Sequence, residues 1–514
     1  MARSLITPGR VLLVGVLVFG LIFACVLVTS MQNDIWIPPD NEVIQFAVTP
    51  TEAPPVEIPT TTPTMVKPIL TPTPDAPHPL PAIRAEAEQY VVQPRDSLHY
   101  IAQRYFVSVE AILGANDLSQ PDYLEVGQVL TIPAPQPDAT GPGFKVIPDS
   151  ELIFGPASID FNAKNFIHSQ GGYLSEYKEE VDDRKMSGVK IIQRVAQEFS
   201  VNPRLMLAVL EYQSGWVTNE NPEEETLDYP IGVAVDWRKG LYNQLAWAAD
   251  NLNRGYYLWQ VNGLAVWILA EGSIVSIDPS INAGTAGVQH LFSQLYEGEE
   301  WQHAVNSTGL FSVYNKFFGY PFHYAVEPLL PADLAQPPMQ LPFESGQSWS
   351  FTGGPHGGWG SGSAWAAIDF APPGEALGCV QNEAWVVAVA DGLVLRVDNG
   401  AVIQDLDNDG LEQTGWTVLY MHVEARNRVR EGTFLQAGEP IGHPSCEGGV
   451  SSGTHLHLAR RYNGEWIPAD QEVPFVLDGW TTEGLGREYD GYLTKDGKTI
   501  EAWEGRDSIN EIQR

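Results

Sequence analysis

The sequence predicts a multidomain chain with an N-terminal transmembrane helix, a small βααβ module, a mainly α central domain and a mainly β C-terminal domain. An uncharged apolar run lies near the N-terminus, helical periodicity fills the middle, and short strands with many glycines follow from about residue 341. The 514 residues exceed one compact domain. We therefore divide the chain into 1–30 (cytoplasmic tip and anchor or signal), 31–87 (linker), 88–133 (small module), 134–149 (second linker), 150–340 (helical domain), 341–472 (C-terminal domain) and 473–514 (C-terminal extension).

Composition excludes several classes of protein. The chain has 29 basic and 64 acidic side chains and a net charge of −35, so nucleic acid and anionic lipid surfaces are disfavoured as main partners. An apolar fraction of 44% with 15 Trp is ample for buried cores and rules out wholesale disorder. Three cysteines are too few for a disulfide scaffold.

The N-terminal segment predicts where the protein resides. Residues Val11 to Thr29 carry no charge over 19 positions, which is just enough to cross a bilayer. Arg3 and Arg10 precede this run, and a positive flank stays inside, so we expect a single-pass cell-membrane protein with its bulk outside the cytoplasm. Two alternatives stay open, namely secretion after cleavage of a signal peptide and a lipid anchor on Cys25.

A linker rich in Pro and Thr follows from about Gln32 to Ala85 and shows no apolar periodicity. Prolines favour extended polyproline II, so this segment predicts a spacer that holds the next domain away from the membrane. A disordered spacer of no specific length is the alternative.

A compact module is expected over residues 88–133. A strand at Tyr90, N-cap candidates at Asp96 and Ser97, two short helices and a closing strand give the order β-α-α-β. The module resembles the lysin-motif (LysM) family through Tyr90-Val-Val, Arg95-Asp-Ser-Leu, Ile101-Ala, Tyr105, Asn116 and Val126-Gly-Gln-Val-Leu-Thr-Ile-Pro. That resemblance implies binding of glycan containing N-acetylglucosamine. Arg95 departs from the family's usual Gly beside the glycan groove, and the alternative is a scaffold repeat that has lost its sugar.

The central domain is expected to be helical. Val189 to Phe199, Asn202 to Trp216 and Tyr242 to Trp259 predict helices, the second with Pro203 in its tolerated first turn. This stretch faintly resembles the lysozyme-like superfamily of muramidases and glucosaminidases, in which a buried helix ends in Glu-Ser-Gly and the Glu is the general acid. Here the corresponding segment is Gln213-Ser-Gly-Trp.

Gln213 argues against glycosidase activity, because an amide cannot supply the proton that glycoside cleavage requires. Glu211 lies two residues earlier, about 200° round the helix, and cannot simply take over. Glu220 and Asp236 remain as alternative acids. We therefore favour a wall-binding or spacing domain that kept the fold and lost the chemistry, with an active glycosidase as the alternative.

Five of the eleven histidines fall in the C-terminal domain. His455 and His457 are two apart in a strand-like segment and therefore share a face. His422 ends another alternating strand, and His356 lies thirteen residues before Asp369. Two imidazoles and one carboxylate make a tripodal Zn²⁺ site with a fourth position left for water.

These segments resemble the lysostaphin-type zinc endopeptidases, which cut peptide cross-links in bacterial cell walls, over about 120 residues (353–470). Trp365 stands where most of that family has its first histidine, so the sequence is similar to the β-lytic branch with its longer glycine-rich loop. The resemblance implies zinc binding by His356, Asp369 and His457 and catalysis by the pair His422 and His455. A degenerate pseudo-enzyme is the alternative.

Two smaller features belong to the same domain. Cys379 and Cys446 both lie in this exported part of the chain and are expected to pair. His443 lies near the site but matches no ligand of the family, so we expect a loop histidine.

An acidic loop follows the central strands. Asp405, Asp407 and Asp409 resemble the first half of a calcium loop. Trp416 stands where an EF-hand needs its bidentate Glu, so an EF-hand is excluded. We expect either weak Ca²⁺ binding assisted by Glu412 or a plain acidic turn.

Together these features predict an envelope-anchored peptidoglycan hydrolase. The LysM module would hold glycan strands while a Zn²⁺-dependent endopeptidase hydrolyses stem-peptide or cross-bridge amides. The alternatives are a non-catalytic glycan-binding protein that activates or positions another hydrolase, and a glycosidase acting through the central domain.

Overall fold

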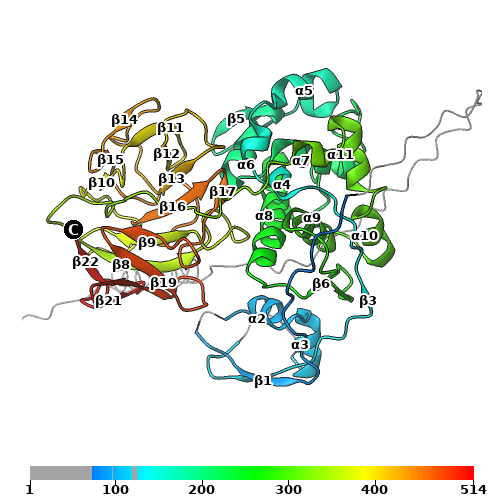
Figure 1. Cartoon of the computed structure of the whole chain (residues 1–514), viewed down its shortest axis with the longest axis horizontal. Coiled ribbons are helices and arrows are strands. Elements are labelled where there is room, and N and C mark those ends of the chain that lie inside the picture. The colour runs from blue at the N-terminus through cyan, green and yellow to red at the C-terminus, as the bar shows by residue number, and fades with distance from the viewer. Residues whose placement is uncertain (1–71, 95, 119–123) are drawn as a thin grey trace, which may run out of the picture. The chain divides into compact units, whose positions relative to one another are not determined.

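The computed structural model describes residues 72–94, 96–118 and 124–514 (Figure 1). The predicted membrane helix and most of the first linker lie outside the described residues. Within those three ranges, no helix combines the length and apolarity needed to span a bilayer.

The small module has the expected β-α-α-β order, in the elements β1 (Glu88–Val91), α2 (Leu98–Tyr105), α3 (Val109–Ala115) and β2 (Val129–Ile132). Its two strands pair antiparallel. Of the two N-cap candidates, Ser97 caps α2 by accepting from Tyr100 N at 3.1 Å. Asp96 instead accepts a hydrogen bond of 2.6 Å from the Tyr90 hydroxyl. Asn116 joins α3 to β2 through two hydrogen bonds with the backbone of Thr131.

The last part of the predicted linker packs against the central domain. The segment is therefore not an extended spacer over its full length. His78 stacks on the ring of Trp259 at 4.3 Å between centroids, and its backbone N donates to Pro279 O. Lys145 forms an ion pair with Asp75 at 2.8 Å. Residues around 75–78 are therefore bound to α8 and to neighbouring loops by ring, backbone and charge contacts.

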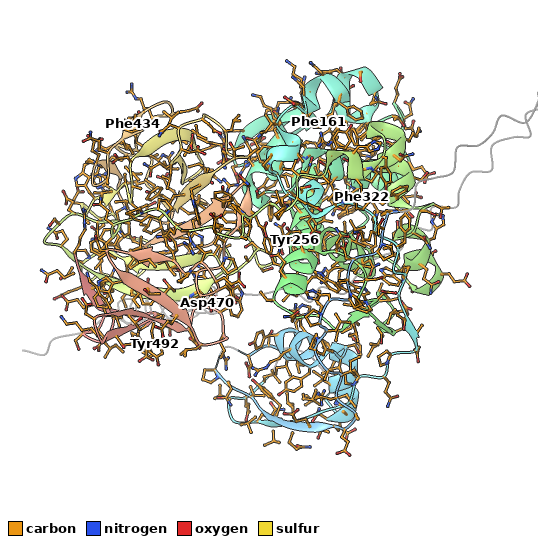
Figure 2. All side chains as sticks on the ribbon, viewed as in Figure 1. Phe161, Tyr256, Phe322, Phe434, Asp470 and Tyr492 are labelled. Carbon is orange, nitrogen blue, oxygen red and sulfur yellow. A yellow bond between two sulfur atoms is a disulfide. The ribbon has the colours of Figure 1, made fainter. Side chains whose placement is uncertain are left out.

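The central domain is mainly helical, with the helices α4 (Asp149–Leu152), α5 (Ala163–Gln170), α6 (Gly188–Phe199), α7 (Pro203–Ser214), α8 (Leu241–Gln260), α9 (Ala283–Ser293), α10 (Gly298–Ala304) and α11 (Leu310–Phe318). α8 buries Tyr256 in the core (Figure 2). A Cβ at Gly255 would lie 2.5 Å from His290 Cβ, and one at Gly287 would lie 2.6 Å from Leu252 O. Glycine at both positions therefore permits the close packing of α8 against α9.

The central domain also contains two small sheets that helical periodicity did not predict. One joins β3 (Ala139–Thr140), β6 (Val266–Ile268) and β7 (Ile274–Ser276), and the other is the hairpin of β4 (Lys178–Val181) and β5 (Arg184–Ser187). Their strands are two to four residues long. Strands of this length are too short to show a clear period-2 pattern.

The C-terminal domain is built on a nine-stranded antiparallel sheet with the order β14-β11-β12-β13-β16-β9-β8-β22, in which β17 also pairs with β16. Its strands are β8 (Ser348–His356), β9 (Ala367–Ala371), β11 (Gly392–Asp398), β12 (Ala401–Asp405), β13 (Trp416–Met421), β14 (Phe434–Leu435), β16 (Leu456–Tyr462), β17 (Glu465–Trp466) and β22 (Glu511–Gln513). A separate pair joins β10 (Val386–Val387) and β15 (Pro440–Gly442).

The C-terminal extension is an integral part of this domain. It forms a four-stranded antiparallel sheet of β18 (Val476–Leu477), β19 (Trp480–Gly484), β20 (Gly491–Lys495) and β21 (Lys498–Glu501). β22 then returns to the edge of the main sheet, where Glu511 pairs with Ser350 of β8. The extension therefore covers one edge of the sheet, which shields that edge from pairing with other chains.

The strand β16 separates two hydrophobic cores. Leu456 and Leu458 point into the core of the C-terminal domain, whereas Ala459 packs in one core with the central helices. This follows from the alternation of side chains along a strand. Polar contacts reinforce the packing, since Gln260 of α8 donates to Glu465 Oε1 at 2.8 Å.

The stability of the protein should fall as pH rises through the titration of Glu465. Burial raises the pKa of Glu465 to about 7, so the folded state favours the neutral acid. This stabilisation is fully present below about pH 4.5, the ordinary pKa of a glutamate, and is lost as pH rises to about 7. The free energy of unfolding falls by about 3 kcal/mol over that range. Glu465→Gln should raise the melting temperature at pH 8 and leave it unchanged at pH 4.

The matched control is Glu472→Gln, which changes an exposed carboxyl of the same domain. It should shift the melting temperature at neither pH. Equal pH dependence of the wild type and Glu465→Gln, measured by scanning calorimetry, would contradict the role of Glu465.

Candidate metal centre and active site

Three neighbouring strands bring the predicted metal-binding residues together. His356 ends β8, Asp369 lies in the middle of β9, and His457 lies near the start of β16. In the antiparallel register His457 is opposite Asp369, and Gly353 of β8 is opposite Asp369 on the other side. A Cβ at Gly353 would lie 2.9 Å from Asp369 Oδ2, so glycine leaves the room that the carboxylate occupies.

The three side chains have the geometry of a zinc tripod. His356 Nε2 lies 2.9 Å from His457 Nδ1, and Asp369 Oδ1 lies 3.2 Å and 3.3 Å from these two nitrogens. A tetrahedral Zn²⁺ with bonds of about 2.0–2.1 Å separates its ligands by about 3.3 Å. Asp369 Oδ1 is also buried without a hydrogen-bond partner of good geometry. The ligand set therefore fits a zinc ion.

Backbone carbonyls orient both histidines of the tripod. His356 Nδ1 lies 2.8 Å from Gly354 O, and His457 Nε2 lies 3.1 Å from Gly358 O. A nitrogen that faces a carbonyl carries the proton, so the opposite nitrogen of each ring is left as a lone-pair donor. Those opposite nitrogens are the two that converge with Asp369.

Burial and mutual attraction shift the pKa values at this centre. Burial opposes the charged form of Asp369, but the nearby His356 and His455 outweigh it and hold the pKa of this carboxyl well below its usual range. Burial also opposes the charged form of His356, yet Asp369 raises the pKa of that imidazole. Burial lowers the pKa of His457. The carboxylate is therefore ionised and His457 neutral, as metal ligation requires, and His356 would release a proton when a metal binds.

The predicted catalytic pair lies beside the tripod. The ring centroids of His422 and His455 are 4.5 Å apart, and His455 Nε2 lies 3.7 Å from Asp369 Oδ2. His422 Nδ1 lies 3.1 Å from Glu447 O, and His455 Nδ1 lies 2.8 Å from Gly453 O. In both rings the Nδ1 proton is thus held by a carbonyl, which leaves Nε2 for chemistry.

His422 is held in an unusual backbone conformation. Its φ of +66° lies in the left-handed region, which costs a non-glycine residue about 1–3 kcal/mol and is typical of functional sites. Ser445 stabilises the turn, because its backbone N and its hydroxyl both donate to His422 O. Burial lowers the pKa of His422 to about 3, with His455 contributing.

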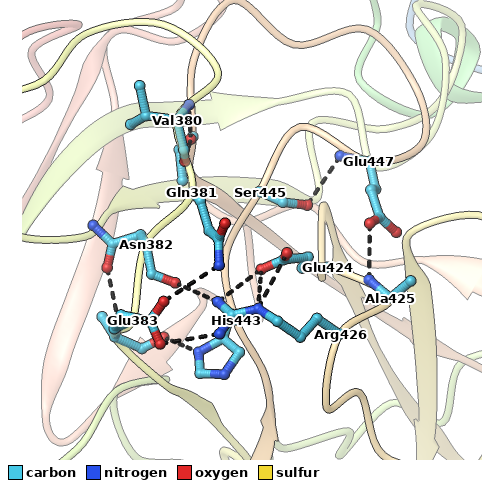
Figure 3. Close-up of polar contacts among 12 residues, drawn as sticks. Val380, Gln381, Asn382, Glu383, Glu424, Ala425, Arg426, His443, Ser445 and Glu447 are labelled. Carbon is cyan, nitrogen blue, oxygen red and sulfur yellow. Dashed lines mark hydrogen bonds and ion pairs between the residues drawn. The ribbon is translucent and has the colours of Figure 1, made fainter.

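Polar contacts join three loops, at residues 380–383, 424–426 and 443–447, into one cluster (Figure 3). Glu447, whose carbonyl faces His422, accepts from Ala425 N at 2.9 Å, and Arg426 binds Glu383 and Glu424. His443 belongs to this cluster of loops and not to the tripod. Its Nδ1 lies 3.0 Å from Ala384 O, and its ring lies 4.0 Å from that of Trp385.

A disulfide also links two loops of this cluster. Cys379 and Cys446 are bonded, with a separation of 67 residues in sequence. Closing a loop of that length contributes about 4 kcal/mol in the chain-entropy account. Thr454, next to His455, is bound to the same cluster of loops, since Val380 N donates to its hydroxyl at 2.9 Å.

Sequence reasoning missed Tyr489, which the C-terminal extension brings to the site. Its ring stacks on His356 with 4.2 Å between centroids and 21° between planes. The backbones are also paired, because Gly354 N donates to Tyr489 O and Tyr489 N donates to Pro355 O. No spacing or motif could signal this residue, since it lies 32 positions beyond His457 and outside the segment that carried the resemblance.

The three aspartates of the acidic loop lie close together, but their contacts differ from those of the expected calcium site. Oxygens of Asp405, Asp407 and Asp409 lie within 4.8 Å of one another. Asp405 already accepts from the backbone N of Asp407 and Gly410, as in an ordinary polar turn. The expectation that Glu412 assists was wrong, because its carboxylate binds Arg396 and Arg461 on the interior side. Calcium binding therefore stays a prediction without support.

The end of α7 shows how the central domain uses its polar residues. Gln213 Oε1 accepts from the Tyr296 hydroxyl at 2.9 Å. Glu211 accepts from the backbone N of Val217 and Thr218 and from the Thr218 hydroxyl. Its carboxylate thus stabilises the turn after the helix. Glu220 and Asp236 are exposed.

A buried His–Asp–His tripod flanked by two further histidines defines the class of zinc-dependent hydrolases. Comparison with known families agrees: residues 369–468 match peptidase family M23, residues 90–133 match the LysM domain, and residues 145–331 match the N-terminal domain of LasA. The chain thus combines a LysM domain with an M23 peptidase domain, which confirms both resemblances. The lysozyme-like character of the central domain stays a prediction, since the family matched there is a different one.

Parts of the chain are similar to individual known proteins. The chain is 27% identical to Protease LasA of Pseudomonas aeruginosa over 289 residues, which is 52% of this chain and 65% of that protein. It is 28% identical to the β-lytic metalloendopeptidase of Lysobacter enzymogenes over 167 residues, 31% of this chain and 90% of that protein. The solved M23 metalloprotease pseudoalterin, from the deep sea, is 24% identical, with 34% of this chain and 97% of that chain covered at a TM-score of 0.27. The chain therefore spans about 65% of the length of its LasA relatives.

Removal of a tripod ligand should abolish zinc binding. In His457→Ala the zinc affinity should fall by more than the roughly 10–100-fold that loss of an outer-shell partner causes. Equilibrium dialysis against buffered zinc, with metal content read by atomic absorption, measures this. The control is His168→Ala, which removes an exposed histidine of α5 and should leave the affinity unchanged. Undiminished zinc in His457→Ala would refute the ligand set.

Tyr489 should stabilise the zinc-binding orientation of His356. Tyr489→Ala removes a stacked ring worth about 0.5–1.5 kcal/mol, so zinc affinity should fall about 2- to 10-fold. Tyr489→Phe keeps the ring and should retain wild-type affinity in the same dialysis experiment. An equal loss in both variants would assign the effect to the hydroxyl and contradict the stacking role.

Proposed function

We propose that this protein is a zinc-dependent endopeptidase that hydrolyses stem-peptide or cross-bridge amide bonds of peptidoglycan. The observation that carries the proposal is the convergence of His356, Asp369 and His457 on one point, with His422 and His455 beside them. The M23 match covers four of these five residues (369–468), and the LasA and β-lytic relatives bear names of a protease and a metalloendopeptidase.

The chain's own residues divide the work of amide hydrolysis. Zinc, when bound, would polarise the scissile carbonyl and lower the pKa of water towards ~7. With a pKa of about 3, His422 is neutral at pH 7, so its Nε2 would accept the proton of the attacking water. His455, as an imidazolium with a proton on each nitrogen, would stabilise the developing oxyanion by donating from Nε2 and then release that Nε2 proton to the leaving amine, which leaves the ring neutral. The carbonyl of Glu447 keeps His422 in the tautomer with a free Nε2, and the carbonyl of Gly453 orients the His455 ring.

The LysM domain would bring this chemistry to its substrate. Binding of glycan by one module makes the second encounter intramolecular, so weak affinity suffices to raise the local concentration of stem peptides. Peptidoglycan, through its glycan strands and its stem peptides, is therefore the proposed partner. The apolar run 11–29 would anchor the chain in the cell membrane with the catalytic domain outside, or direct its secretion if cleaved.

We expect the central domain to bind or space the cell wall and not to cleave its glycan strands. Gln213 stands where a general acid is needed, and the carboxylate of Glu211 is committed to the turn after α7. This keeps the prediction of a domain that retains a wall-binding role without glycosidase chemistry.

Hydrolysis of purified peptidoglycan tests the proposal. The chain from Gln32 onward should release new amino termini that disappear with chelator and return with added zinc, as followed by mass spectrometry of the products. His457→Ala should release none, whereas His168→Ala should match the wild type. New reducing sugar ends would move the activity to the central domain. Binding of peptidoglycan without either product would refute the enzyme and favour a regulator of another hydrolase.

A further inference from the structure

A cavity of about 220 Å³ lies beside α8 and outside the zinc site. Its walls come from α8, from the end of α6 at Phe199, from the short helix η4 (Asp236–Arg238) and from the glycine-rich loop 357–363. The residues that give it chemical character are Trp237, Arg238, Asn243, Trp247, Asp250 and Ser361. Pockets for drug-sized ligands span roughly 300–1,000 Å³, so this one suits a single ring.

Aromatic rings form the apolar part of the cavity. Trp237 keeps 46% of its surface exposed, although Trp is usually well buried. The Arg238 guanidinium lies 3.9 Å from the centroid of the Trp237 ring and 5.8 Å from that of Trp247. The guanidinium thus holds one indole in place next to the other, as cation–π contacts do. Trp237 therefore supplies a half-exposed aromatic face, whereas Trp247 is buried with 6% of its surface exposed.

Polar groups border that surface at helical spacing. Asn243, Trp247 and Asp250 lie four and three residues apart on α8 and therefore share one face. Asn243 is exposed and presents an amide, which can both donate and accept. The two oxygens of Asp250 accept from Gly362 N at 2.7 Å and from the Ser361 hydroxyl at 2.8 Å. A carboxylate has about four lone-pair sites, so Asp250 retains capacity for a ligand.

The loop that closes the cavity also serves the zinc site. It begins directly after His356, and Gly358 O faces His457 Nε2 at 3.1 Å. At its other end, Asp250 and Arg254 of α8 hold Ser361, with Arg254 donating to the Ser361 hydroxyl at 2.9 Å. A molecule in the cavity would therefore lie a few residues along the same loop from the metal ligands.

We propose that this cavity binds one N-acetylhexosamine ring of the glycan strand, in addition to the sugar held by the LysM domain. A pyranose has a C–H face that packs on an aromatic ring and an edge of hydroxyl and acetamido groups that bond to amide, carboxylate and guanidinium. An apolar peptide side chain would need the indoles but not the polar border. Because stem peptides are attached to the sugars, a ring held here would place its peptide on the loop that follows the metal ligand His356. The inference rests on the proposed function for the identity of the glycan.

The test uses the full chain labelled with 5-fluorotryptophan and titrated with chitotetraose, the β-1,4-linked tetramer of N-acetylglucosamine. The LysM domain (88–133) contains no Trp, so fluorine signals do not report sugar binding in its groove. The Trp237 resonance, assigned by its absence in Trp237→Phe, should shift and saturate. The resonance of Trp503, which is 50% exposed and remote in sequence, should stay in place. An unmoved Trp237 resonance overturns the proposal.

A kinetic comparison supplies the second readout. Trp237→Ala should raise the half-saturating concentration of peptidoglycan about tenfold, equivalent to ~1.4 kcal/mol, with kcat unchanged. Cleavage of a sugar-free stem peptide should not change, and Trp503→Ala should behave as wild type. A loss that also affects the sugar-free peptide would assign Trp237 to the fold and overturn the sugar site.

The two hypotheses fail in different ways. Hydrolysis of peptidoglycan without any Trp237 shift would overturn the sugar site and leave the endopeptidase standing. A saturable Trp237 shift in a chain that releases no amino termini would support the sugar site and refute the enzyme.

Discussion

The structure depends on one constraint, which is that the carboxylate of Asp369 is buried and must be compensated there. An ionised group removed from water is tolerated only when it is paired, hydrogen-bonded or bound to metal. Four imidazoles surround or adjoin this carboxylate, and a bound zinc ion would complete the compensation. The antiparallel pairing of β8, β9 and β16 is what brings His356, Asp369 and His457 within 4 Å of one another.

Much of the surrounding architecture serves that arrangement. Glycine at position 353 leaves space for the carboxylate, and a carbonyl faces one nitrogen of each histidine. Loops fastened by the disulfide support one side of the site, and the C-terminal extension places Tyr489 on the other. The central helices hold the loop that follows His356 through Asp250 and Arg254. Catalysis and wall recognition would thus share a single segment of backbone.

The sequence predicted the site better than its surroundings. The roles of the five site residues were expected from the resemblance to the lysostaphin-type zinc endopeptidases, and the shared face of His455 and His457 from the alternation of side chains along a strand. The small sheets of the central domain could not be predicted, because strands of two to four residues carry no period. The docking of the linker near His78 and the pairing of Glu412 with Arg396 and Arg461 were also missed. Both depend on partners distant in sequence.

By itself the sequence determined the order of the segments, the ligand types available to a metal and the presence of an amide instead of a carboxylate at position 213. These are properties of composition, spacing and side-chain chemistry. Only the tertiary structure decided which nitrogen of each histidine faces the centre, that Tyr489 covers His356, and that Trp237 and Asp250 meet the glycine-rich loop. The physical reason is that burial, tautomer and contact are set by groups from strands and helices far apart along the chain, which meet only when the two cores pack against β16.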